Sequence, residues 1–181
     1  FFRLYNKLSG MTGTALTESN NVDNTTVVVA KIGTTYYTTF AAAYAAANEG
    51  DTITLLADMS MSEILTINKG ITLDGNGKTL TSTAGRAINV SGADGAKIQN
   101  LTINASGERA INIIQNATNV TIDNVTATAA NYTVNIAGSA ANAVVTIKDS
   151  ELTGLNVVNV GASGANITIS DSTIKCNDQN D

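Results

Sequence analysis

Four charged residues have types and a spacing that suit acid–base chemistry. Arg86 and Arg109 stand 23 residues apart, each just before an apolar-Asn-apolar triplet, with Glu108 and Asp123 nearby in the sequence. Clustered carboxylates can hold Ca²⁺, and charged side chains beside them can take part in proton transfer. The simpler interpretation is that these are solvated charges that pair across neighbouring structural repeats. Both interpretations place the two arginines at equivalent positions of a repeat.

The composition excludes several other kinds of chemistry. Among 181 residues there is no histidine, which excludes His-based triads and general bases, and Cys176 is the only cysteine, so no internal disulfide forms. A net charge of −5 with ten Lys and Arg residues argues against a nucleic-acid partner. No run of about 18 apolar residues is present, so no membrane-spanning helix is predicted. The sequence predicts no catalytic residue, cofactor or metal.

Two short patterns alternate from residue 71 onward and define an internal repeat. The apolar-Thr-apolar pattern occurs at 71–73, 120–122, 145–147 and 167–169, and 96–98 holds the same place with Lys. The apolar-Asn-apolar pattern occurs at 88–90, 111–113, 134–136 and 158–160, in steps of 23, 23 and 24 residues. A looser third strand follows the first in most periods, at 101–103, 125–127 and 152–153. The chain therefore repeats three short strands in one fixed phase.

This repeat predicts an all-β fold, a parallel β-helix with coils of about 23 residues. In each triplet the two apolar side chains share one face and the polar one points the opposite way. We therefore expect Ile, Val and Leu to face inward and the rows of Thr and Asn to face solvent. The absence of proline fits, because nearly every strand N–H must bond to the adjacent coil.

The N-terminal part predicts a different arrangement. An alanine-rich stretch at 39–49, preceded by threonine and followed by Gly50, predicts a helix that caps the solenoid. Segments 27–32 and 36–38, joined at Gly33-Thr34, predict a hairpin in the same cap. The expected organisation is a tail and polar linker at 1–26, then a β-helix domain at 27–181 with its cap at 27–50 and its coils at 51–175.

Residues 30–175 resemble right-handed parallel β-helix domains of the pectin-lyase-like type, which are common in bacterial surface proteins. The matching segments are Ala30-Lys31-Ile32-Gly33, Asn48-Glu49-Gly50-Asp51-Thr52-Ile53-Thr54-Leu55 and Leu73-Asp74-Gly75-Asn76-Gly77-Lys78. The resemblance implies a right-handed coil and a location outside the cell or on its surface. It implies no single activity, since the fold serves lyases, hydrolases, adhesins and phage tailspikes. Residues 1–19 resemble a segment of the bacterial preprotein translocase ATPase, but no phosphate-binding loop accompanies them.

Two functions remain open at this stage. The first is a non-catalytic surface module that acts as a filament subunit, an adhesin or a spacer. The alternative is a polysaccharide-binding or polysaccharide-degrading β-helix of the lyase or tailspike type, with Arg86, Arg109, Glu108 and Asp123 as its face. The threonine rows likewise allow two interpretations, a structural ladder or a surface for ice or a repetitive polymer.

The two ends of the predicted solenoid indicate self-assembly. The helix covers the first coil, whereas the strands at the other end are followed only by polar residues. We expect a homo-oligomer, a head-to-tail filament in which an apolar tail reaches the open end of a neighbour; continuation of the coils in a longer chain is the other interpretation. The residues expected at this contact are Phe1, Phe2, Leu4, Tyr5, Leu8, Ile167, Ile169 and Ile174.

Overall fold

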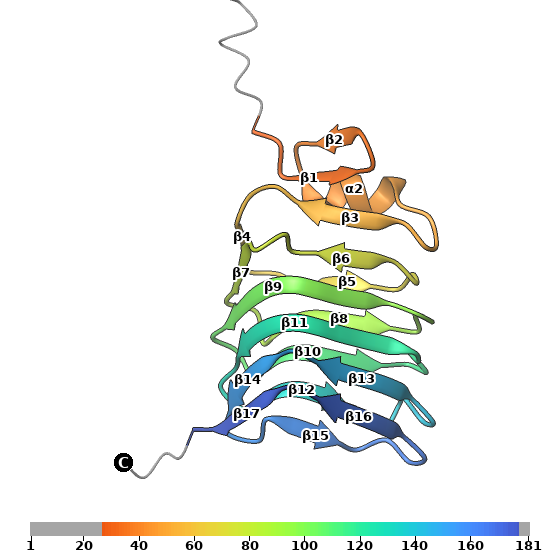
Figure 1. Ribbon diagram of the computed structural model, residues 1–181, viewed down its shortest axis with the longest axis vertical. Coiled ribbons are helices and arrows are strands. Elements are labelled where there is room, and N and C mark those ends of the chain that lie inside the picture. The colour runs from red at the N-terminus through yellow and green to blue at the C-terminus, as the bar shows by residue number, and fades with distance from the viewer. Residues whose placement is uncertain (1–26, 178–181) are drawn as a thin grey trace, which may run out of the picture.

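A computed structural model describes residues 27–177 and shows a parallel β-solenoid of about five turns (Figure 1). The expected coil of about 23 residues is confirmed. The tail residues Phe1, Phe2, Leu4, Tyr5 and Leu8 lie outside the described part of the chain.

Three strand stacks form the walls of the solenoid, and two long strands, β9 (Lys97–Ala105) and β11 (Val120–Thr128), bend to serve two of them. The first face contains the N-terminal halves of β9 and β11 with β3 (Thr52–Leu55), β6 (Thr72–Asp74), β13 (Val144–Lys148) and β16 (Asn166–Ser170). The second face contains their C-terminal halves with β4 (Met59–Met61), β7 (Thr79–Ser82), β14 (Glu151–Gly154) and β17 (Thr173–Cys176). The third face contains β5 (Leu65–Ile67), β8 (Arg86–Ser91), β10 (Arg109–Ile114), β12 (Tyr132–Ile136) and β15 (Val158–Val160).

Equivalent residues stack directly on one another because the coils pair in a fixed parallel register. Ile111 pairs with Ile88 in the coil before it and with Val134 in the coil after it. On the first face Ile122 pairs in the same way with Ile98 and Ile147. All of these side chains are fully buried in one continuous core. Each coil therefore buries its apolar side chains against the next coil.

The corner between the first and second faces depends on residues in the left-handed backbone conformation. Asn100, Asn124, Asp149 and Asp171 have φ between 49° and 52°, each two residues after the last apolar residue of the Thr triplet. Among residues other than glycine, asparagine and aspartate tolerate this conformation best. A single residue of this kind turns the chain sharply from one face to the next.

The N-terminal cap has the expected hairpin and a helix shorter than expected. Strands β1 (Ala30–Ile32) and β2 (Thr35–Tyr37) are antiparallel, and β1 also pairs antiparallel with β3, so the hairpin extends the first face. Helix α2 (Phe40–Ala46) begins after Thr39, whose side chain accepts a hydrogen bond from Ala42 N at 3.1 Å. It ends before the predicted residue 49 because Ala47 is already extended.

The Lys69 ammonium group closes the C-terminal end of α2. It donates to the carbonyl oxygens of Tyr44 and Ala47, at 3.0 and 2.7 Å. A cation at this end of a helix satisfies carbonyl groups that have no partner within the helix.

The stacked core gives a direct test of the inward and outward positions. We expect Ile122→Asp to bury an unpaired charge and to lower the free energy of unfolding by more than about 4 kcal/mol. Thr121→Asp, one residue away, should cost less than about 1 kcal/mol, because Thr121 is only half-buried and pairs in register with Lys97. Urea denaturation of the two variants measures the difference, and equal losses would contradict the assigned orientation.

Candidate functional site

Arg86 and Arg109 stack one coil apart at the start of β8 and β10, as their spacing predicts. In the next coil Tyr132 occupies the same position, and the Arg109 guanidinium lies over its ring, with Cζ 5.5 Å from the ring centroid. Arg109 also donates to Asn112 Oδ1 and pairs with Glu108 Oε1, at 3.3 and 3.2 Å. The Nε atoms of both arginines are buried without a hydrogen-bond partner among the described residues. The Arg109 guanidinium thus makes three contacts within the chain, with Glu108, Asn112 and Tyr132.

Asp123 does not join this group. It lies on β11 in the first face, where its carboxylate pairs with Lys97 Nζ at 2.8 Å and with Lys148 Nζ at 3.1 Å. The hydrogen bond from Lys97 lowers the pKa of Asp123 below its ordinary value of 3.8, partial burial opposes the shift, and Lys148 adds to it. Of the four charged residues predicted as a polysaccharide face, the structure therefore brings together Arg86, Arg109 and Glu108, and places Asp123 on another face.

The asparagine row on the third face forms a continuous amide ladder. Asn112 Nδ2 donates to Asn89 Oδ1 at 2.9 Å, and Asn135 and Asn159 continue the series at 2.7 Å each. The expectation that this whole row faces solvent is wrong for Asn112 and Asn135, which are 2% and 3% exposed. Neighbouring amides cover them from both sides, and Arg109 contacts Asn112. The amide groups of these two residues are used within the ladder.

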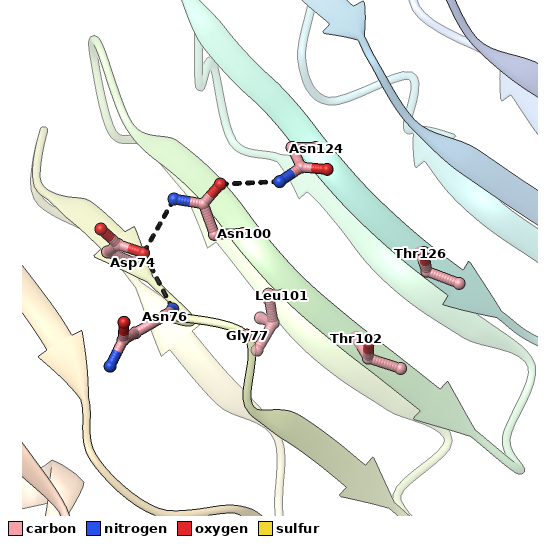
Figure 2. A pocket seen from close by; sticks show the side chains of 8 residues that line it. All are labelled: Asp74, Asn76, Gly77, Asn100, Leu101, Thr102, Asn124 and Thr126. Carbon is pink, nitrogen blue, oxygen red and sulfur yellow. Dashed lines mark hydrogen bonds between the residues drawn. The ribbon is translucent and has the colours of Figure 1, made fainter.

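A polar groove lies where the chain departs from the regular corner (Figure 2). Its volume is about 420 Å³, and it is lined by Asp74, Asn76, Gly77, Asn100, Leu101, Thr102, Asn124 and Thr126. It forms because β6 ends at Asp74 and β7 begins at Thr79, whereas β9 continues through the corner without a break. The segment between β6 and β7 packs on the coil below it, as shown by the ideal Cβ position of Gly75, only 2.5 Å from Asn100 O.

The single carboxylate of the groove is already used as a hydrogen-bond acceptor. Asp74 Oδ1 accepts from Asn76 N at 2.9 Å and from Asn100 Nδ2 at 3.1 Å, and Oδ2 accepts from Gln99 Nε2 at 3.1 Å. Asn124 Nδ2 donates to Asn100 Oδ1 at 2.9 Å, which continues the corner as a second amide ladder. No lining residue is positively charged or aromatic. The groove offers hydroxyl and amide groups but no paired acid and base.

The last described coil exposes apolar side chains that are buried in the coils before it. Ile169 and Ile174 are each 44% exposed, whereas their register partners Ile147 and Leu152 are fully buried. Ile167, the third residue expected at an assembly contact, is half-buried against the core. The exposed residues lie on β16 and β17, at the C-terminal end of the solenoid in Figure 1.

Comparisons of the chain with protein-family models, with curated proteins and with solved structures found no match. The evidence for the β-helix fold is therefore the structure alone. No matching family supports the pectin-lyase-like or the translocase resemblance. Within residues 27–177 no three Asp, Glu or Cys side chains gather in a group that would hold a metal ion. The one helix of this part of the chain, α2, is too short to cross a membrane.

The Lys97–Asp123–Lys148 contacts predict a pH-dependent contribution to stability. Because the folded pKa of Asp123 is lowered, its stabilisation is complete above the ordinary pKa of 3.8 and disappears as the pH falls through the folded pKa. We expect Asp123→Asn to lower the free energy of unfolding by about 0.5 kcal/mol near pH 7. Urea denaturation should show a smaller difference between the variant and the wild type near pH 2 than near pH 7. A difference of the same size at both pH values would contradict this role.

Proposed function

We propose that this chain is a non-catalytic structural module that works outside the cell or at its surface and assembles end to end. The observation that carries this proposal is the distribution of exposed apolar side chains. Of nine large apolar residues exposed in the described part of the chain, seven lie at the two ends of the solenoid. They are Val27, Val28 and Tyr36 at the N-terminal end, and Leu155, Val160, Ile169 and Ile174 on or just before β15, β16 and β17, the last strands of the three faces.

Open strand edges at the same two ends support a head-to-tail contact. The sheet that includes the first face begins with β2 and finishes with β16, and among residues 27–177 each of these strands is paired along one side only. The outer edge of such a strand presents free N–H and C=O groups that pair readily with another strand. Addition of β2 of one copy to β16 of another joins unlike surfaces, and a contact of this kind that does not close gives a filament.

The side walls of the solenoid support a role without catalysis. Their charged groups neutralise one another, as in the Asp123 pairs with Lys97 and Lys148 and the pair between Lys175 and Glu151. Their amides stack into ladders, and the polar groove holds one carboxylate that is fully hydrogen-bonded. The proposed location outside the cell rests on the resemblance of residues 30–175 to β-helix domains of bacterial surface proteins.

Charged substitutions at the two ends test the proposed contact. Full-length wild type should form assemblies whose size grows with concentration, measured by size-exclusion chromatography with light scattering. Ile169→Lys should block the C-terminal end and Tyr36→Lys the N-terminal end, because a lysine on an edge strand prevents pairing. Each variant alone should be monomeric. Mixed together, they should form dimers and nothing larger, because each retains one open end.

The control is Thr146→Lys, which adds the same charge to a side wall and should assemble like the wild type. A wild-type chain that stays monomeric at every concentration contradicts end-to-end assembly. Assembly of Tyr36→Lys alone contradicts the head-to-tail arrangement and indicates that two C-terminal ends meet.

A second candidate function, the binding or cleavage of a polysaccharide, is favoured by the Arg86–Arg109 stack with its unpartnered Nε atoms. Cleavage lacks support because Glu108 is the one carboxylate paired with the stacked arginines among the described residues, whereas Ca²⁺ takes a set of several oxygen ligands. We expect no unsaturated uronate product from acidic polysaccharides, with or without Ca²⁺, when absorbance is followed. Product that disappears in Arg109→Ala would contradict a non-catalytic role.

A further inference from the structure

The second face carries a two-column grid of threonine side chains. Strands β7, β9, β11, β14 and β17 each present two outward positions there, and the fixed register aligns them down the face. The residue between the two positions is buried in the first four strands and exposed in β17, where it is Ile174. Seven of these ten positions are threonine. The first column is Thr79, Thr102, Thr126, Glu151 and Thr173, and the second is Thr81, Asn104, Thr128, Thr153 and Lys175.

Buried residues between the two columns hold the threonine side chains of this grid in place. The residues between the two columns in the first three rows, Leu80, Ile103 and Ala127, are buried in the core at 1% exposure or less. Threonine has few χ1 rotamers because it is branched at Cβ. Figure 2 shows Thr102 and Thr126 at equivalent positions of β9 and β11, with their side chains projecting in the same direction. Within a column the spacing is about 4.8 Å, and along a parallel strand it is about 6.6 Å.

The hydroxyl groups of the grid are free to bind a partner. None of the threonines in the first four rows makes a side-chain hydrogen bond to another described residue, although Thr133, a buried threonine on the third face, does. The first three rows contain no charged side chain, and the charges of the last two rows, Glu151 and Lys175, pair with each other. Each threonine thus offers one hydroxyl and one methyl group at a regular two-dimensional spacing.

We propose that this threonine grid binds the surface of ice. A partner that fits the grid must have a structure that repeats in two dimensions. It must also accept and donate hydrogen bonds, and accommodate the threonine methyl groups that lie between the hydroxyl groups. Water ordered as a lattice has these properties, and a rigid grid binds it without having to be ordered first. A saccharide surface fits less well, because sugar binding relies on aromatic rings. The aromatic residues of the described chain lie in the cap and on the third face.

The test measures thermal hysteresis and inhibition of ice recrystallisation by the full-length chain, with albumin at equal concentration as the baseline. Wild type should exceed the baseline in both assays. Thr126→Tyr, in the middle of the grid, should lose most of this activity while keeping the wild-type melting temperature. Thr121→Tyr is the matched control, since it changes the same residue type on the same strand but on the first face, and it should keep full activity.

Other outcomes contradict the proposal. The proposal is overturned if the wild type shows no more thermal hysteresis or recrystallisation inhibition than albumin. Equal loss of activity in Thr126→Tyr and Thr121→Tyr also overturns it. If wild type binds insoluble chitin or cellulose and has no effect on ice, and Thr126→Tyr abolishes this binding, the grid binds a polysaccharide surface instead. The end-blocked monomer Ile169→Lys should keep activity on ice, so this result is independent of end-to-end assembly.

Discussion

Parallel hydrogen bonding between successive coils, in a register that places like residues over like residues, is the constraint on which the rest of the structure depends. It buries Ile88, Ile111 and Val134 against one another, and it aligns Asn89, Asn112 and Asn135 into an amide ladder. A shift of one residue would turn the apolar side chains outward and break both arrangements. Stability in such a fold comes from contacts between neighbouring coils.

The same constraint separates the properties of the walls from those of the ends. On the walls, polar groups of one coil bond to polar groups of the next coil. The Asp123 carboxylate and the Asn112 amide are therefore paired within the chain. In the last described coil, residues whose equivalents are buried in earlier coils, such as Ile169, are exposed. Polar walls and apolar ends are the properties expected of a unit that stacks along its axis.

The sequence was sufficient for the fold because its signals are local and repeated. The triplets around Asn112 and Thr121 predict strands, their spacing predicts the coil, and the stacking of Arg86 on Arg109 follows from that spacing. Properties that depend on contacts between different strands were harder to predict. The burial of Asn112 needs amides above and below it, and the pairing of Asp123 with two lysines depends on which face β11 presents. The left-handed corners at Asn100 and Asn124 do have a sequence signal, because an Asn or Asp stands two residues after every triplet of this series except the first, which is followed by Gly75.

Electron microscopy of the purified full-length chain tests the central claim, that the solenoid stacks end to end, most directly. Head-to-tail stacking predicts unbranched rods one solenoid wide, with an axial repeat equal to the length of one subunit and β-strands perpendicular to the rod axis. Isolated particles at high protein concentration, or arrays in which subunits touch along their walls, would contradict it.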